Sequence, residues 1–224
     1  MCGRYSLGKK PRSWPADGEE FVPRFNIAPT QEAMVFVSGQ SSRLERMRWG
    51  LVPHWAADEQ AGLKMINARG ETLRQKPAFR GCLETRRCAI PADSFYEWRN
   101  NGKAKEPVRF LMQDREPFFF AGLWDEWRKP DGGMLRSFTI VTTTPNDLVL
   151  PLHDRMPVIL RPEQTGEWLS SDQSVCETLE NWLSPFPAEA MTSYSVDRRL
   201  NNAKVDDEQC IEPVVERDPM LPGF

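Results

Sequence analysis

Several common signals of function are absent from this sequence. No CxxC pair occurs among its five cysteines, and an odd number of thiols argues against a disulfide framework, so we expect neither zinc nor disulfides. No apolar run approaches the roughly 18–20 residues that a membrane-spanning helix requires. The first ten residues also lack the apolar stretch of a signal peptide. We therefore expect a cytoplasmic protein without membrane, metal or small-molecule cofactor, in which Cys2 stays a thiol.

The 224 residues are 40% hydrophobic and include 19 prolines and 14 glycines, a composition that favours short strands and turns over a helical bundle. Internal repeats and low-complexity tracts are absent. Segments rich in β-branched and aromatic residues predict strands at 34–38, 44–49, 87–91, 95–99, 108–112, 117–124, 137–143, 157–160 and 192–196. Turns are expected at 100–103 and 129–133, and helices at 162–170, 175–183 and, as a short piece, within 142–152. The pattern predicts one mixed domain, 1–224.

Charge divides unevenly along the chain although the net charge is only -3. Residues 1–109 carry 19 Lys and Arg against 12 Asp and Glu, whereas residues 110–224 carry 10 against 20. A basic first half can build a positive face for nucleic acid. Chance fluctuation between the halves explains the same numbers.

Cys2 follows Met1 directly, and its small side chain permits removal of that methionine. The new terminus would carry an amine and a thiol on adjacent carbons, with ordinary pKa values near 8 and 8.5. Such a pair condenses with an aldehyde to an imine and then closes a five-membered thiazolidine. Gly3 allows close approach of a ligand and Arg4 adds a fixed charge. The plain alternative is a small second residue without a role.

Polar side chains interrupt apolar segments at several further points. Asn67 and Arg69 lie in INARGET, and Glu97 lies between two aromatic residues, where desolvation raises a carboxyl pKa unless the side chain faces solvent. His153, one of only two histidines, belongs to a polar HDR triplet inside an apolar run. The segment 24–30 predicts a rigid turn rather than chemistry.

Trp49, Trp55, Trp98, Trp124 and Trp127 lie beside these segments. Single-stranded nucleic acid is often held by stacked aromatic residues together with cations on its phosphates. Most of these tryptophans are expected in the core. Trp55, in a loop-like stretch, is the predicted stacking residue.

Eight motifs occur in order and together resemble the SRAP family (SOS response-associated peptidase), the abasic-site shielding proteins. They are MCGRY, FNIAPT, MRWGLVPHW, INARGET, CAIPADSFYEW, AGLWDEW, FTIVTT and LHDRMPVIL, and they span residues 2–160. RRLNNAKVDD (198–207) is a weaker echo. Residues 161–224 would complete the domain. Ser94, where the family pattern has glycine, and the segment 143–150 depart from it.

The resemblance implies a single α+β domain, with a β-barrel-like core of short, mostly antiparallel strands and a few peripheral helices. It also implies a covalent crosslink between Cys2 and an abasic site in single-stranded DNA, with self-cleavage or an aminopeptidase removing Met1. By motif position, Asn67, Glu97 and His153 match the other active-site groups, and Arg4, Arg69 and Arg155 match phosphate contacts. Weak strand cleavage (lyase activity) is a side expectation, and we expect a monomer.

Two other functions stay open. One is an N-terminal-nucleophile cysteine amidohydrolase, such as a glutaminase, which also begins with a mature cysteine whose amine acts as base. The other is a non-catalytic module for single-stranded nucleic acid, whose binding would depend on salt and not on Cys2.

Overall fold

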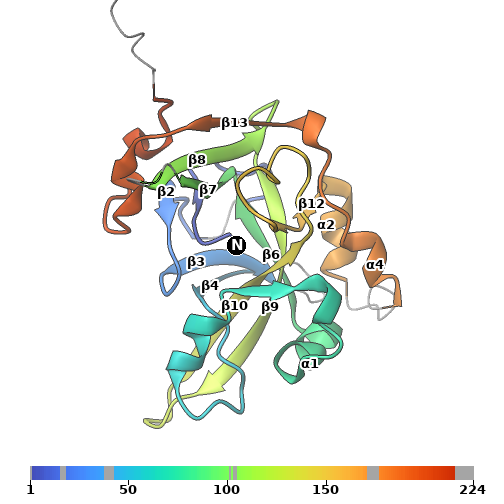
Figure 1. Cartoon of the computed structure of the whole chain (residues 1–224). Coiled ribbons are helices and arrows are strands. Elements are labelled where there is room, and N and C mark those ends of the chain that lie inside the picture. Colours follow the sequence, from blue (N-terminus) through green and yellow to red (C-terminus); the bar gives the residue numbers. More distant parts are fainter. Residues whose placement is uncertain are drawn as a thin grey trace, which may run out of the picture.

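The computed structural model describes residues 2–15, 19–37, 43–100, 102, 105–170 and 177–214 (Figure 1). Two curved sheets pack against each other, and helices lie at the periphery. The N-terminal segment runs between the sheets near the middle of the molecule, which places Cys2 deep in the structure (Figure 1).

Five strands close into a barrel. They are β3 (Glu32–Val37), β4 (Arg43–Trp49), β6 (Arg87–Ala92), β9 (Phe118–Arg128) and β10 (Met134–Thr143). The hydrogen-bonded order β4-β3-β6-β9-β10 is antiparallel, and β10 returns to β4 in parallel, which closes the ring. The predicted barrel-like core of mostly antiparallel strands is therefore confirmed. Because the barrel is closed, each of these five strands pairs with another barrel strand on both sides.

A five-stranded antiparallel sheet lies beside the barrel in the order β13-β8-β7-β1-β2. Its strands are β1 (Tyr5–Leu7), β2 (Arg24–Ile27), β7 (Ser94–Asn100), β8 (Lys105–Met112) and β13 (Met191–Ser195). Because β13 pairs with β8 along its whole length, the C-terminal part of the chain belongs to the same sheet as the N-terminal strand.

Short elements complete the structure. The strands β5 (Asn67–Arg69), β11 (Met156–Pro157) and β12 (Ile159–Leu160) add to the barrel sheet. The α-helices are α1 (Pro77–Thr85), α2 (Pro162–Trp168) and α4 (Leu179–Trp182). Short 3₁₀ helices occur at η1 (Glu59–Lys64), η2 (Gly70–Thr72), η3 (Ala188–Ala190), η4 (Arg198–Asn201) and η5 (Glu208–Ile211).

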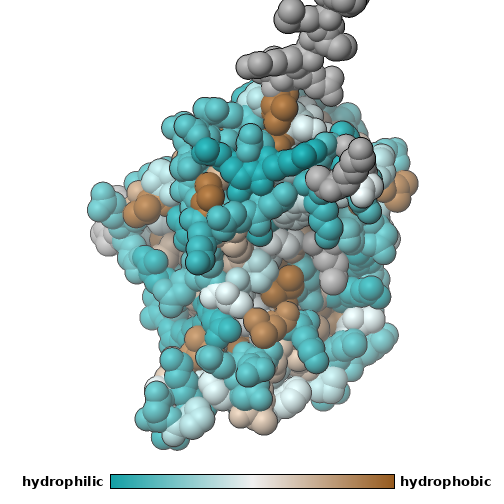
Figure 2. Space-filling model, turned by 60° about the vertical axis from the view of Figure 1, so that its left-hand side comes forward, coloured by the Kyte–Doolittle hydropathy of each residue, from teal (hydrophilic) through white to brown (hydrophobic). Residues whose placement is uncertain are grey.

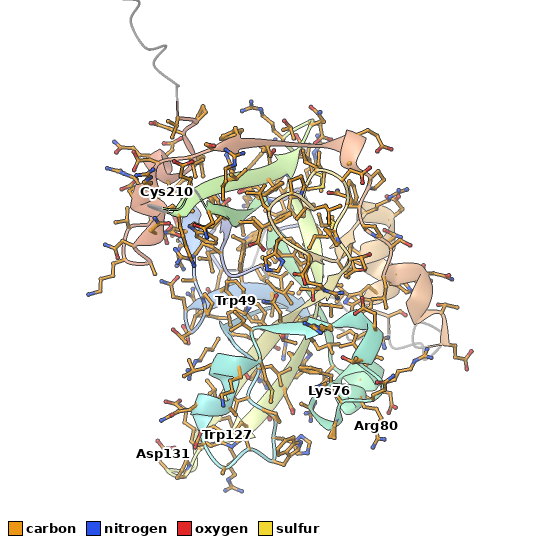
Figure 3. All side chains as sticks on the ribbon, in the orientation of Figure 1. Trp49, Lys76, Arg80, Trp127, Asp131 and Cys210 are labelled. Carbon is orange, nitrogen blue, oxygen red and sulfur yellow. The ribbon has the colours of Figure 1, made fainter. Side chains whose placement is uncertain are left out.

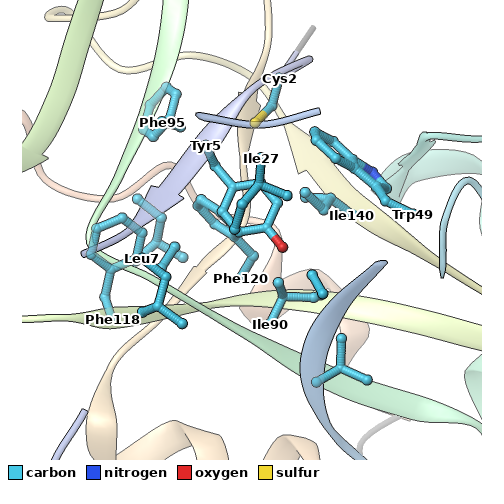
Figure 4. Close-up of a cluster of buried hydrophobic side chains, with 14 of the residues drawn as sticks. Cys2, Tyr5, Leu7, Ile27, Trp49, Ile90, Phe95, Phe118, Phe120 and Ile140 are labelled. Atoms are coloured by element: carbon cyan, nitrogen blue, oxygen red, sulfur yellow. The ribbon is translucent and has the colours of Figure 1, made fainter. Parts of the chain in front are cut away.

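Aromatic side chains fill the space between the two sheets. The ring of Tyr5 packs edge-on against Trp49 at 5.2 Å and Phe120 at 5.8 Å, and Phe95 stacks on Phe110 (Figure 4). Each such side chain buries roughly 150–250 Å², so this cluster supplies much of the hydrophobic stabilisation. A second buried cluster lies under α1, α2 and α4, where the Trp168 indole donates to the Cys88 carbonyl.

The surface view is mostly hydrophilic, with apolar residues isolated from one another (Figure 2). The exposed large hydrophobic residues in the described part of the chain are Val22, Trp55, Leu63, Met134, Leu150 and Val214. The β9–β10 hairpin projects at one end, with Trp127 and Asp131 far from Cys210 (Figure 3).

The predicted strands are confirmed within a few residues, although β9 and β10 are longer than the predicted segments. The turn at 129–133 is also confirmed, with Gly132 at φ 88. The turn at 100–103 and the start of the helix at 175–183 fall partly outside the described residues. The helix within 142–152 is wrong: successive turns occupy 147–152, because Pro145 and Asn146 interrupt the strand and Pro151 follows closely. The turn at 24–30 begins as strand β2.

Candidate functional site

Cys2 lies at the start of the segment that enters between the two sheets. Its side chain has no exposed surface, and it borders the aromatic cluster near Phe95 and Trp49 (Figure 4). The Asn67 side-chain amide donates a 2.8 Å hydrogen bond to the Cys2 carbonyl. Two residues further on, the Arg4 carbonyl accepts from the Tyr96 amide and lies 3.8 Å from the Cys2 thiol. Hydrogen bonds from Asn67 on β5 and Tyr96 on β7 thus hold the segment around Cys2 in place.

Burial changes the acidity of the thiol. The pKa of Cys2 lies well above its ordinary value, chiefly because burial disfavours the thiolate and also because the Glu97 carboxylate is close. The ordinary thiol pKa of about 8.5 therefore does not apply to Cys2 in this buried position. The sulfur is therefore protonated until a base takes its proton.

Glu97 is a candidate for that base. It lies on β7 and is only 4% exposed, and burial raises its pKa to about 7. The N-terminal amine opposes this rise and the charge of Asp154 adds to it. The desolvated alternative for this residue therefore agrees with the structure, and the solvent-facing alternative does not. A carboxyl group with this pKa is populated in both protonation states near neutrality, which suits proton transfer in either direction.

His153 lies on the segment between β10 and β11. The Arg155 amide lies 3.0 Å from its Nδ1 and donates to it in the tautomer that carries the proton on Nε2. Burial lowers the pKa of His153, partly offset by Asp154, whose carboxylate lies 2.9 Å from Nδ1. The ring is thus neutral at pH 7 and presents an N–H donor.

The charges of these residues shift one another's pKa values. The Glu97 carboxylate acts on the Cys2 thiol, and Asp154 acts on both Glu97 and His153. Asn67, on the short strand β5, contacts Cys2 directly, while its Oδ1 is buried without a hydrogen-bond partner among the described residues. The structure thus brings the four predicted site residues to one place from four separate segments of the chain.

The predicted phosphate-binding arginines differ in their surroundings. Arg69 is exposed at the end of β5. Arg4 is half-buried, donates to Asn26 and to the Leu200 carbonyl, and lies 5.8 Å above the Trp98 ring. Arg155 is 8% exposed and forms a bidentate pair with Glu71 at 2.7 and 2.9 Å. The guanidinium groups of Arg4 and Arg155 thus already have internal partners.

Trp55 projects from the loop after β4 and is 58% exposed, whereas Trp49 and Trp127 are buried and Trp98 and Trp124 are half-buried. Its loop is anchored on both sides. The buried Asp125 carboxylate accepts from the His54 amide at 2.9 Å, and the Trp127 indole donates to the Ala56 carbonyl at 2.7 Å. Trp55 is therefore an exposed aromatic side chain on a loop whose backbone is held in place.

Three residues that support this arrangement were given no role from the sequence. Glu71 holds Arg155, Asp154 adjoins His153, and Asp125 anchors the Trp55 loop. Glu71 and Asp154 lie inside motifs already quoted, and Asp125 is a polar residue in the apolar segment AGLWDEW, so a signal existed in each case. Their partners are remote in sequence.

No group of three His, Cys, Asp or Glu residues among the described ranges is arranged to hold a metal ion. Within the same ranges, every helix is too short or too polar to cross a bilayer.

Comparison with known proteins decides the family. The sequence profile of the SOS response associated peptidase (SRAP) family matches residues 1–203. The chain belongs to the SRAP family. Among curated relatives, Abasic site processing protein YoqW of Bacillus subtilis is 45% identical over 223 residues, covering 95% of this chain and 99% of its own. Abasic site processing protein HMCES of Gallus gallus is 30% identical, covering 90% of this chain and 69% of its own.

Solved structures agree with this SRAP assignment at the level of fold. A crystal structure of a protein from Bordetella bronchiseptica matches with a TM-score of 0.76 and 28% identity, covering 88% of this chain and all of the other. One from Bacteroides thetaiotaomicron matches with a TM-score of 0.75 and 27% identity over 85% of each chain. The resemblance that the sequence motifs carried is thus confirmed.

Proposed function

We propose that this SRAP protein recognises abasic sites in single-stranded DNA and forms a covalent thiazolidine crosslink through Cys2 once Met1 is removed. The observation that carries the proposal is the placement of Cys2, held by Asn67 beside a Glu97 whose pKa is near 7. The names of its relatives, which describe abasic site processing, point to the same substrate.

The first chemical requirement is an open-chain sugar. The abasic deoxyribose is mostly a closed hemiacetal, and opening it moves a proton from the C1 hydroxyl to the ring oxygen. Glu97 can take one proton and return another because both of its states are populated near pH 7. The neutral His153 would donate a hydrogen bond from Nε2 to a sugar oxygen. An abasic nucleotide has no base to unstack, so extruding it costs less than flipping an intact one.

The second requirement is covalent capture. The Cys2 amine adds to the aldehyde carbon to give a carbinolamine, which takes up a proton on its hydroxyl, loses water and then releases its nitrogen proton to leave an imine. The sulfur then attacks the imine carbon while its proton passes, directly or through Glu97, to the nitrogen. Holding amine, thiol and aldehyde together supplies an effective concentration of about 10⁵ M or more. The buried Asn67 Oδ1 would accept from the amine.

The strand would be positioned by contacts that do not read sequence. Arg69 and Trp55 have exposed side chains suited to a phosphate and a base face, respectively. Arg4 and Arg155 stay predictions as phosphate contacts, and each would first have to share or release the internal acceptors described above.

The test is a mass measurement of the purified protein with and without an abasic single-stranded oligonucleotide. We expect loss of Met1 and a denaturation-resistant adduct whose mass is that of protein plus DNA minus one water. Cys2→Ala should lose this adduct while still binding DNA. Cys2→Ser should form an imine that borohydride traps but that does not persist without it. A Cys2→Ala protein that crosslinks like wild type contradicts the mechanism.

Two accompanying activities follow from the same chemistry. An imine that fails to close allows β-elimination, so Cys2→Ser should show weak strand cleavage. The peptidase name is explained if the site itself removes Met1. If only the site removes Met1, Cys2→Ala should retain Met1. Alanine at the second position still lets an aminopeptidase act, so this variant distinguishes the two routes. Loss of Met1 from Cys2→Ala would assign the cleavage to an aminopeptidase.

The alternatives predict different results. An amidohydrolase would release ammonia from glutamine and give no DNA adduct. A non-catalytic binding module would bind DNA in a salt-dependent way and be indifferent to Cys2 substitution. We propose that the protein acts as a monomer in the reducing cytoplasm, shielding lesions during the DNA damage response. Cys2, Cys82, Cys88 and Cys210 are free thiols, as that compartment favours.

A further inference from the structure

A closed ring of buried polar side chains lies at the junction of β1, β7 and β8. Ser6 donates to Asp93 and its hydroxyl lies against that of Ser94, while Arg109 Nε donates to the Ser94 hydroxyl at 2.8 Å. Arg109 Nη2 donates to the Asp93 carboxylate at 3.3 Å, which closes the ring. All four side chains are at least nine-tenths buried. None of them has a place in the chemistry proposed above.

The ring has one consistent direction. Since Ser6 gives its proton to Asp93 and Arg109 has only donors, Ser94 must accept from Arg109 and donate to Ser6. Hydrogen bonds that are chained in this way strengthen one another in a buried setting. The carboxylate of Asp93 also accepts from the backbone amides of Gly8 at 2.6 Å and Lys9 at 3.0 Å.

Strand alternation separates the ring from the reactive groups. Tyr5 and Leu7 of β1 and Phe95 of β7 point into the aromatic core that Cys2 borders, so Ser6 and Ser94 point to the opposite face of the sheet. Glu97 is three residues from Ser94 on the same strand, and by alternation it shares the face of Phe95. The ring thus lies on the opposite face of the sheet from Glu97 of β7, behind the strand β1 that follows Cys2 in the chain.

The strand β1 needs such a device because it is short. It comprises three residues, and its pairing with β7 involves two of them, Tyr5 with Phe95 and Ser6 with Ser94. Its pairing with β2 is irregular between Tyr5 and Leu7. A slip of one residue would turn every side chain to the other face. We propose that the Ser6–Asp93–Arg109–Ser94 ring sets the register of β1 on β7 and thereby positions Cys2 for reaction beside Glu97.

These four are positioning residues, and the inference rests on the crosslinking function proposed above. Crosslinking depends on the placement of amine, thiol and carboxyl, and a misplacement of about 1 Å can cost a hundredfold in rate. Breaking the ring should therefore slow crosslinking strongly, even where the loss of one hydrogen bond lowers the stability of the fold only slightly.

The experiment measures single-turnover crosslinking at saturating abasic DNA for wild type, Ser6→Ala, Ser94→Ala and the double variant. Each single variant should slow crosslinking about tenfold or more at a temperature where it is fully folded. The limb of the pH–rate profile that belongs to Glu97 should move, because the distance between its carboxyl and the thiol changes. The double variant should be little slower than either single variant, because one break already opens the ring.

Ser137→Ala is the matched control. Ser137 is equally buried and accepts from the Val52 amide at 2.7 Å, but it lies on β10, which pairs with β4, β5, β9 and β11. It should lower the melting temperature without altering the Glu97 limb. If Ser6→Ala and Ser94→Ala melt earlier yet crosslink at the wild-type rate with an unchanged pH profile, the ring is structural only and the inference is overturned. Failure of wild type to crosslink would instead overturn the proposed function.

Discussion

The side-chain amide of Asn67 donates to the carbonyl oxygen of Cys2 across 2.8 Å, and this bond joins the barrel to the chain terminus. β5 is held in register by parallel pairing with β10, so it transmits the rigidity of the barrel to Cys2. Asn67→Ala should reduce the crosslinking rate at least tenfold and lower the free energy of unfolding by about 1 kcal/mol. Single-turnover gels and denaturant titration measure the two effects. Equal crosslinking rates would exclude Asn67 from the mechanism.

Glu97 makes stability depend on pH. Its pKa is near 7 in the folded protein against an ordinary value of 4.5, so the folded state binds the extra proton between these values. The resulting stabilisation is present below pH 4.5 and is lost as the pH rises to 7, amounting to roughly 3 kcal/mol. Glu97→Gln, which cannot ionise, should be flat across this window. Thermal unfolding from pH 4 to 8 checks the sign, and a wild type that gains stability over this window relative to Glu97→Gln contradicts it.

Trp55 should contribute to DNA binding and little to folding. Removing an exposed stacking residue costs about 1–3 kcal/mol of binding per base. Trp55→Ala should therefore weaken binding of single-stranded DNA tenfold or more with an unchanged melting temperature. Met134→Ala, which removes another exposed apolar side chain, is the control and should bind normally. Fluorescence anisotropy with an undamaged oligonucleotide separates binding from crosslinking.

Arg69 and Arg155 should behave differently. Arg69→Ala should weaken DNA binding across sequences and reduce the slope of log affinity against log salt by about one. Arg155→Lys cannot reproduce the bidentate contact with Glu71 and should mainly destabilise the protein. Salt titrations and melting curves of both variants give the comparison. An unchanged salt slope for Arg69→Ala would remove this residue from the DNA interface.

Sequence patterns predicted the long strands because β9 and β10 are dense in aromatic and β-branched residues. They missed β1, β2 and β5, since three or four residues are too few to show a period. The helix α1 was also missed, because its apolar positions Phe79, Cys82 and Leu83 are few, even though a proline at the first helical position favours a helix start. Propensity within 142–152 misled because prolines at 145 and 151 outweigh the apolar residues between them.

The site was predicted more completely than its electrostatics. Motif positions predicted Cys2, Asn67, Glu97 and His153 as site residues, and the fold places them near one another. Whether an arginine is available for DNA depends on partners that are remote in sequence, such as Leu200 for Arg4. The depth at which Cys2 is buried likewise follows from packing between the two sheets, which no local pattern encodes.

The burial of Cys2 also affects how long its thiol survives unoxidised before it reacts. A thiolate is oxidised when it attacks peroxide or a disulfide, and here the sulfur is both covered by its surroundings and held in its protonated form. Under the proposed function each molecule would react only once, so it would have to survive intact until it meets an abasic lesion. Burial of the sulfhydryl would then preserve this group until a docked strand brings the aldehyde to it.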